Sequence, residues 1–426
     1  MEVSTKKIAN ARINGTILQT IMHNGQPKLV VVDKGKITVE DSWETALGER
    51  FEPAETSYIE KGLLVVPTAV DPTELNKVFD DLVDFFKRNV LLQDEDILLL
   101  AVFCYYTWHY DRTATAPYLM LVGDYGTAKS RVLELLKLTS FNACNLGTAV
   151  SSANVYRVQE ALSGTQLIDE FESHETDKSN PFVQILNNGY KEGGIIIRSE
   201  QKNNAWVPTP FNVFGPKAIA TRTLPKDDAL ISRCFVLKTM RINKKLLLAN
   251  GIPLDLNAKI KKEAESLRNR LLALRIRDAN KPAKFANQLK FKTTMPRDEQ
   301  LLRSILSVFP EEYQLLLAET LELSLYLGRL TPTLKIEVDM ACVISQILSE
   351  VDDWKNKLPM NFTLKELGEK ITKFKNKTYK PRALAAAARR MGFECQRMNT
   401  GTVIILDDLN NIESFQDRYL LLVPVG

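Results

Sequence analysis

The sequence predicts an α/β protein whose centre is a parallel β-sheet covered by helices. Between about residues 114 and 242, short apolar strands alternate with helical stretches, which is typical of such a sheet. A glycine-rich turn in this region, residues 123–130, joins an apolar strand to a helix. The expected segments are a small β-rich N-terminal domain (1–72), a helical linker (73–113), the α/β core (114–242), a helical lid (243–334) and a C-terminal domain (335–426).

Composition excludes several classes of protein. The chain has 426 residues, of which 45% are hydrophobic and 25% charged, which excludes a disordered or fibrous protein. The formal net charge is only +4, so a surface for nucleic acid has to be local. The most apolar stretch, residues 97–106, is about half as long as a membrane span. Because the N-terminus also lacks the apolar core of a signal peptide, we expect no membrane segment.

Cysteine and histidine usage indicates a reduced, cytoplasmic protein without a zinc site. The five cysteines are an odd number, and no two are spaced as the ligands of a metal knuckle. They are Cys104, Cys144, Cys234, Cys342 and Cys395. The three histidines, His23, His109 and His174, are far apart and show no ligand spacing either, so packing explains them more readily than a metal.

The N-terminal domain is expected to consist of short strands. β-branched or alternating runs predict strands at residues 13–21, 28–32, 36–39 and 62–66, with turns at Asn24-Gly25 and Lys34-Gly35. From residue 72 onward, apolar residues between Leu75 and Phe86 recur at helical spacing. Residues 246–328 are also expected to be helical, with Leu267, Leu271 and Leu274 on one face.

The stretch from 118 to 131 is the most informative part of the sequence. A strand at 118–122 leads into a turn that reads GDYGTAKS, and a helix follows from Arg131. Such a loop surrounds phosphates with backbone N–H groups, and the helix N-terminus adds its dipole. Lys129 is expected to bind the β- and γ-phosphates and Ser130 to ligate Mg²⁺. The candidate ATP-binding set is Gly123, Asp124, Tyr125, Gly126, Thr127, Ala128, Lys129, Ser130 and Arg131.

Two further strand ends carry candidate catalytic residues. The apolar run at 165–168 ends in Asp169 and Glu170, the Walker B pattern, in which Asp169 holds the metal and Glu170 polarises the attacking water. The strand at 217–221 ends at Thr221 and Arg222, and either of them is a candidate to sense the γ-phosphate. Arg233 follows a short helix at 228–232, where it is a candidate arginine finger or, alternatively, a surface salt-bridge residue.

These motifs resemble those of the minichromosome-maintenance (MCM) helicases within the AAA+ class. Residues 123–130, with alanine before the lysine, resemble their Walker A motif, and residues 168–171 resemble their Walker B motif. Residues 230–233 are similar to their arginine-finger box, and residues 191–195 to the start of their pre-sensor-1 hairpin. Arg297 stands where their lid supplies a sensor-2 arginine. The resemblance implies an AAA+ P-loop core with a helical lid, ATP hydrolysis coupled to DNA unwinding, and a hexameric ring.

The chain also departs from this family, with which it shares about residues 114–306. The N-terminal segment is shorter than in the family and lacks the cysteines of its zinc knuckle, and residues 146–164 are too few for the hairpin that the family inserts there. The plan is closer to that of short MCM-like helicases from mobile elements, phages or plasmids.

Two regions are expected to contact DNA. Residues 195–211 read as a β-hairpin with a polar tip, for which Lys191, Arg198 and Lys202 are candidate contacts, although a lysine in a turn is often merely solvated. The C-terminal domain resembles a winged helix-turn-helix, with a capping box at 363–366, a helix at 381–391 and a wing between strands at 393–397 and 402–406. Its candidate contacts are Lys380, Arg382, Arg389, Arg390 and Arg397, unless the domain binds protein instead.

The sequence therefore predicts an ATP-dependent DNA helicase or translocase of DNA replication, with ATP and Mg²⁺ bound between subunits of a ring. Two alternatives remain. One is an ATP-switched, DNA-binding initiator or loader that does not unwind processively. The other is an AAA+ remodeller of proteins.

Overall fold

The structure is a computed structural model that describes residues 5–147, 151–171, 180–202, 205–239, 243–293, 295–329, 332–375, 377–391, 393–398 and 401–406. The chain forms two compact units. The first comprises Met1–Leu289 with Arg297–Ser324, and the second comprises Lys290–Pro296 with Leu325–Gly426. Each unit is described by itself.

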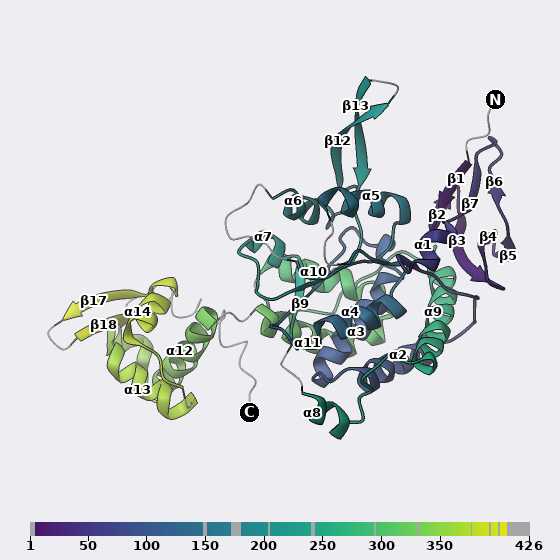
Figure 1. Cartoon of the computed structure of the whole chain (residues 1–426). Coiled ribbons are helices and arrows are strands. Elements are labelled where there is room, and N and C mark those ends of the chain that lie inside the picture. Colours follow the sequence, from purple (N-terminus) through teal and green to yellow (C-terminus); the bar gives the residue numbers. More distant parts are fainter. Residues whose placement is uncertain are drawn as a thin grey trace. The chain divides into compact units, whose positions relative to one another are not determined.

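A six-stranded sheet forms the centre of the first unit (Figure 1). Its strands, in spatial order, are β15 (Cys234–Lys238), β9 (Tyr118–Val122), β14 (Lys217–Thr221), β11 (Gln166–Ile168), β10 (Ala143–Asn145) and β8 (Leu64–Val65). All neighbours pair in parallel except β8, which is antiparallel to β10. The prediction of an α/β fold with a parallel sheet is therefore confirmed.

The strand β8 corrects one expectation. Residues 62–66 were expected in the N-terminal domain, but Leu64 and Val65 pair with Cys144 and Ala143 and extend the central sheet. Leu64 is buried there beside Cys144 in an apolar cluster. The reason is that a short apolar strand gains more burial at the edge of a covered sheet than on an exposed one.

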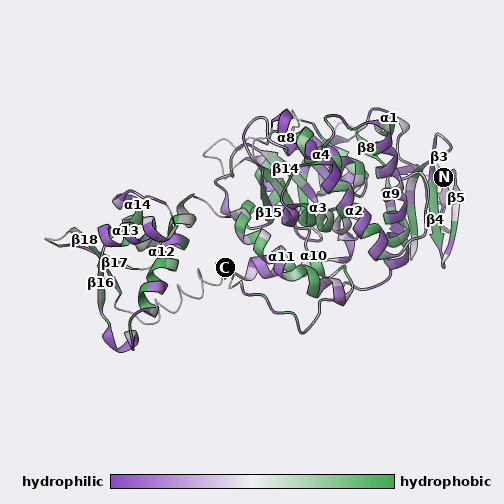
Figure 2. Ribbon diagram, turned by 90° about the horizontal axis from the view of Figure 1, so that it is seen from below, coloured by the Kyte–Doolittle hydropathy of each residue, from purple (hydrophilic) through white to green (hydrophobic). Residues whose placement is uncertain are grey.

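Helices surround the sheet. Those of the first unit, wholly or for most of their length, are α1 (Thr56–Glu60), α2 (Leu75–Asn89), α3 (Asp94–Thr107), α4 (Lys129–Thr139), α5 (Ser152–Leu162), α6 (Pro181–Asn188), α7 (Asp228–Ile231), α8 (Lys244–Ala249), α9 (Ala258–Asp278), α10 (Pro296–Leu306) and α11 (Glu311–Arg329), with the 3-10 helix η1 (Tyr110–Arg112). Figure 2 shows the strands β14 and β15 as largely hydrophobic and the hydrophilic residues gathered on the outer helices.

The stretch expected as a helical linker, 73–113, is part of the core instead. Every residue of α3 from Leu99 to Thr107 is buried, because this helix is apolar on all sides. The helix α2 packs on α3 and on α9. Among the described residues, no helix has the length and apolar character needed to cross a membrane.

Two small sheets form the N-terminal part. One contains β2 (Asn10–Ile13), β3 (Thr16–His23), β4 (Gln26–Asp33) and β5 (Lys36–Glu40), and the other contains β1 (Thr5–Ile8), β7 (Arg50–Pro53) and β6 (Trp43–Glu44). The turns at Asn24-Gly25 and Lys34-Gly35 are confirmed, since all four residues have positive φ. The run 13–21 is not one strand, because Asn14 (φ 50°) and Gly15 (φ 89°) form a further turn of the same kind.

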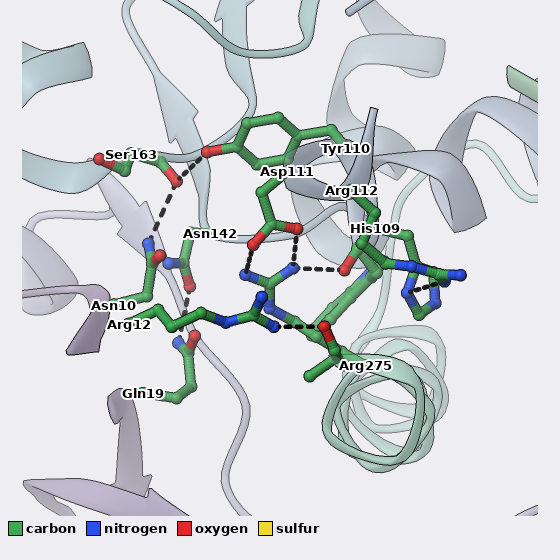
Figure 3. A network of polar contacts seen from close by, with 12 residues as sticks. Asn10, Arg12, Gln19, His109, Tyr110, Asp111, Arg112, Asn142, Ser163 and Arg275 are labelled. Carbon is green, nitrogen blue, oxygen red and sulfur yellow. Dashed lines mark hydrogen bonds and ion pairs between the residues drawn. The ribbon is translucent and has the colours of Figure 1, made fainter. Parts of the chain in front are cut away.

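A partly buried polar network joins these N-terminal strands to the rest of the first unit (Figure 3). Its contacts are Asn10 Nδ2 to Ser163 O at 3.1 Å, Arg12 Nη2 to Ala279 O at 2.6 Å, Gln19 Nε2 to Asn142 Oδ1 at 2.9 Å, and Arg275 to both carboxylate oxygens of Asp111 at 2.9 and 2.8 Å. The N-terminal strands therefore make specific polar contacts with the rest of the first unit.

The second unit is a small helical bundle against a three-stranded antiparallel sheet. Its elements are α12 (Pro332–Ser349), η2 (Trp354–Lys357), β16 (Met360–Thr363), α13 (Leu364–Lys375), α14 (Pro381–Arg390), β17 (Glu394–Met398) and β18 (Gly401–Leu406). The expected capping box is confirmed: Glu366 N donates to Thr363 Oγ1 at 3.1 Å, and Thr363 N donates to Glu366 Oε2 at 3.0 Å. Asn399 and Thr400, expected in the wing, lie outside the described residues.

Candidate nucleotide-binding site

The glycine-rich loop connects the C-terminal end of β9 to the first turn of α4, as the sequence predicts. Two of its glycines are required by the backbone. A Cβ atom on Gly123 would lie 2.2 Å from Thr239 Oγ1 and 2.8 Å from Thr239 O, so no larger residue fits there. Gly126 has a φ of 70°, a conformation that side chains strongly disfavour. The loop therefore has a compact, specified shape.

Lys129 lies across this loop. Its Nζ atom donates to Gly123 O at 2.5 Å, to Asp124 O at 2.8 Å and to Thr127 Oγ1 at 3.3 Å. These neutral oxygens hold the ammonium group over the loop without neutralising its charge. A phosphate group can therefore replace them and gain a full ion pair.

Thr239, which follows β15, braces the loop from the adjacent strand. Its backbone N donates to Val122 O at 2.8 Å, and its hydroxyl donates to Thr127 Oγ1 at 2.8 Å. Sequence reasoning missed this residue. Thr239 is the residue after β15, and β15 pairs with β9, the strand that leads into the loop. The sequence does not show that these two strands are neighbours.

Asp169 meets the start of α4, as expected for a Walker B carboxylate. The hydroxyl of Ser130 lies 3.5 Å from Asp169 Oδ2, although the two residues are far apart in sequence. They meet because β9 and β11 end at the same edge of the sheet, with only β14 between them. A hydroxyl and a carboxylate are the oxygen donors that Mg²⁺ prefers, so the residues present fit this metal.

Glu170 has a strained backbone. Its φ is 51°, in the left-handed region that a glutamate seldom adopts. The conformation is fixed on both sides, since Glu170 N donates to Asp169 Oδ1 at 2.9 Å and Phe171 N donates to Ala220 O at 2.8 Å. The result is an exposed carboxylate beside Asp169. Strain of this kind, about 1–3 kcal/mol, is characteristic of functional sites.

The structure separates the two sensor candidates at the end of β14. The Thr221 side chain is buried, and its hydroxyl donates to Thr223 O at 2.9 Å. Arg222 instead reaches the loop, with its guanidinium carbon 3.8 Å from the centroid of the Tyr125 ring. Of the two, only Arg222 is shown with its side chain against the glycine-rich loop.

Arg131 is not part of this loop's lining. Its Nη2 atom donates to Pro253 O at 3.0 Å and also to Leu254 O. The guanidinium therefore anchors the segment that leads into α9. The guanidinium of Arg131 is thus directed to that segment rather than to the loop, and nucleotide binding by Arg131 stays a prediction.

Arg233 and Arg297 lie together, away from the loop of their own chain. Their guanidinium carbons are 5.7 and 5.4 Å from the centroid of the Tyr190 ring. Arg233 O accepts a hydrogen bond from Tyr118 N at 3.0 Å, which places it at the start of β9. The loop begins at the other end of that strand, roughly 13 Å away at about 3.3 Å per residue. The structure therefore does not bring these two arginines to Lys129.

The expected hairpin is present as β12 (Ile195–Lys202) and β13 (Ala205–Asn212), and it projects from the first unit (Figure 1). Lys191 is exposed at its base, and the Arg198 guanidinium carbon lies 5.8 Å from the Tyr156 ring centroid. Lys202 pairs with Ala205 at the end of β12. Asn203 and Asn204 lie outside the described residues. The feature that sequence reasoning missed is Trp206, whose relative exposure is 71%.

Four of the predicted basic contacts of the second unit are exposed on its surface. Lys380 is the N-cap of α14, Arg382 and Arg389 are exposed on that helix, and Arg397 is exposed on β17. Arg390 is the last residue of α14. These positions cluster on one helix and the strand after it, which gives the unit a local concentration of positive charge.

Comparison with known proteins adds no family assignment. No family model matches the chain, and no curated protein matches it. Among solved structures, two described as the A form apo structure of the NrS-1 C-terminal region align with it, both over 92% of this chain and 96% of the other. Their identities are 11% and 10%, with TM-scores of 0.34 and 0.32. A likeness at such TM-scores carries no conclusion about fold or function.

Proposed function

We propose that the chain is an ATP hydrolase of the AAA+ class that works as a DNA helicase or translocase. The observation that carries the proposal is the meeting of two distant segments, with Ser130 Oγ 3.5 Å from Asp169 Oδ2 beside the loop that holds Lys129. A packing role does not explain why a lysine, a hydroxyl and a carboxylate gather at the exposed edge of a buried parallel sheet. Binding of a triphosphate and its metal does.

Each residue has a distinct role in this proposal. Lys129 neutralises charge on the β- and γ-phosphates, and the loop N–H groups hold their oxygens. Ser130 and Asp169 hold Mg²⁺, which when bound neutralises charge on the phosphate oxygens. Glu170 orients and polarises the attacking water, and its strained backbone keeps the carboxylate exposed for this purpose.

The separation of Arg233 and Arg297 from the loop supports a site shared between subunits. Both arginines face Tyr190 at the end of the sheet opposite Lys129, where they have no phosphate to bind in their own chain. In a ring, they would reach the ATP of the neighbouring subunit. The hairpin β12–β13 would engage a DNA strand, and the second unit, read as a winged helix, would bind duplex DNA through α14 and β17.

An unwinding assay on forked duplexes with 3′ or 5′ tails tests the proposal. The native chain with ATP and Mg²⁺ should separate one of the two forks, and Lys129→Ala should abolish both unwinding and phosphate release. Lys137→Ala, which removes a lysine near the other end of α4, is the matched control and should unwind normally. ATP hydrolysis without strand separation would favour an initiator or loader if DNA stimulates it, and a protein remodeller if DNA has no effect.

A further inference from the structure

The hairpin β12–β13 has two different faces, and one of them is fastened to α5. Ile196 and Phe211, each 7% exposed, belong to an apolar cluster with Tyr156. Further out, Glu200 Oε1 accepts from Arg157 Nη2 at 3.2 Å. The charged side chains of Arg198 and Glu200 on this face are therefore occupied by contacts with α5.

The opposite face carries no charge. Side chains alternate along a strand, so the residues that pair as 195–212, 197–210, 199–208 and 201–206 share this face. Its apolar members are Ile195, Ile197, Trp206, Pro208 and Pro210. Ile195, Ile197 and Trp206 are 51%, 59% and 71% exposed. A tryptophan is seldom left so open, because its burial is worth several kcal/mol.

The prolines argue against the pairing of another strand with the outer edge of β13. Pro208 and Pro210 have no N–H group to donate to β12. Their backbone nitrogens therefore point away from β12, and so do those of the other β13 residues on the same face, because the direction alternates along a strand. Asn212 conforms, since its N–H donates to Glu160 Oε2 at 2.6 Å rather than to β12. The outer edge of β13 thus lacks two donors that an added strand needs. Chain-to-chain sheet extension is disfavoured there.

We propose that this uncharged face stacks the bases of single-stranded DNA and that Trp206 is its main stacking residue. The proposal rests on the proposed function and names a contact within it. A flat, exposed aromatic ring on a projecting hairpin matches the π-face that every base presents, so it needs no sequence preference. The phosphates of the bound strand would lie outside the apolar face. Lys191, which is exposed at the base of the hairpin, is a candidate to neutralise one of them. Stacking and charge neutralisation are therefore assigned to different residues.

Binding of a labelled deoxythymidine oligonucleotide to the full chain, measured by anisotropy over a range of salt concentrations, tests this assignment. Trp206→Leu should weaken binding by about 5- to 150-fold, the cost of removing one base stack. Trp206→Phe keeps a ring and should retain most of the affinity. Neither should change the salt dependence, whereas Lys191→Ala should reduce its slope, by about 0.7 for each phosphate that is no longer neutralised. Leu47→Ala removes another exposed apolar side chain (91%) and is the control.

An oligonucleotide with abasic sites completes the test. It should bind the native chain about as weakly as the intact oligonucleotide binds Trp206→Leu, because both lack the stack. Equal binding of intact DNA by the native chain and Trp206→Leu overturns the Trp206 assignment and leaves the proposed function standing. Loss of self-association in Trp206→Leu, seen by light scattering, overturns it in favour of a second copy of the chain. No DNA binding by the native chain in any nucleotide state overturns the proposed function itself.

Discussion

Arg222 and Tyr125 stack on one another, with the guanidinium carbon 3.8 Å from the ring centroid. This contact links the end of β14 to the exposed tip of the glycine-rich loop. It brings a second cation, in addition to Lys129, against the loop and gives Tyr125, which is 57% exposed, a role that its sequence position does not suggest. Because a cation–π contact at an exposed site is worth only about 0.5–1 kcal/mol, a triphosphate can compete with the ring for the guanidinium.

Substitutions at the end of β14 distinguish the two sensor candidates. Arg222→Ala should lower ATP turnover by about 10²–10³-fold, the usual cost of removing one group that stabilises developing charge. Thr221→Val removes a buried hydrogen bond to Thr223 O, so it should cost about 1 kcal/mol of stability and leave turnover nearly intact. Phosphate release and thermal unfolding measure the two effects. The opposite pattern would assign sensing to Thr221.

Two substitutions of Glu170 separate the effect of its carboxylate on ATP turnover from the effect of its backbone strain on stability. Glu170→Gly removes the carboxylate and relaxes the left-handed backbone (φ 51°), so turnover should fall by about 10²–10⁴-fold while the free energy of unfolding rises. Glu170→Gln should lose turnover to a similar extent without the gain in stability, and it should still bind ATP because Asp169 is intact. Turnover near the native rate in Glu170→Gln would remove the glutamate from the role of general base.

The geometry of the candidate nucleotide site could largely be predicted from the sequence because its signals are local. A strand, a glycine-rich turn and a Lys-Ser pair at a helix start occur within a few residues, and the structure has each where the pattern predicts it. The strand end at Asp169 is equally local. What the sequence did not reveal depends on which strands are neighbours: Thr239 braces the loop only because β15 lies beside β9.

The exposed face of the β12–β13 hairpin is only partly visible in the sequence. The alternation of Trp206, Pro208 and Pro210 has the period of a strand and predicts a shared face. Which face of the hairpin is exposed, however, depends on α5, which covers the opposite face. That packing is not visible in the sequence. The shared contact of Arg233 and Arg297 with Tyr190 likewise depends on α10 folding back to the start of β9, since Ser304 of that helix contacts Thr115.

His109 should make the stability of the protein depend on pH. Burial, reinforced by the charges of Arg112 and Arg275, lowers its pKa to about 3 from an unfolded value near 6.5 (Figure 3). The folded chain therefore keeps the ring neutral while the unfolded chain binds a proton. Stability is complete above about pH 6.5 and falls as the pH drops toward about 3. Between about pH 6.5 and 4.5, the denaturant midpoint of His109→Phe should fall less steeply with decreasing pH than that of the native chain. If both chains lose stability at the same rate, His109 is not the cause of the pH dependence.

The final prediction concerns whether the proposed active site is shared between subunits. Arg233 lies at the start of β9, beyond the reach of its own Lys129, and its Nη1 atom donates only to Ala229 O among the contacts described for its side-chain donors. An arginine supplied to a neighbour's triphosphate is worth about 10³–10⁵ in rate. Arg233→Ala should therefore bind ATP almost normally, as measured by a fluorescent analogue, yet hydrolyse it very slowly.

Mixing two inactive chains tests whether that arginine acts on a neighbouring subunit. A ring containing both Arg233→Ala and Lys129→Ala chains has some interfaces at which an intact loop meets an intact Arg233, so phosphate release should reappear. Mixing Lys129→Ala with a chain that carries both substitutions is the matched control, and it leaves every loop without its lysine. If the first mixture stays as inactive as the control although light scattering shows co-assembly, Arg233 serves only the structure of its own chain. Its stacking on Tyr190 would then be its whole role, and the ring would need another source of charge for the transition state.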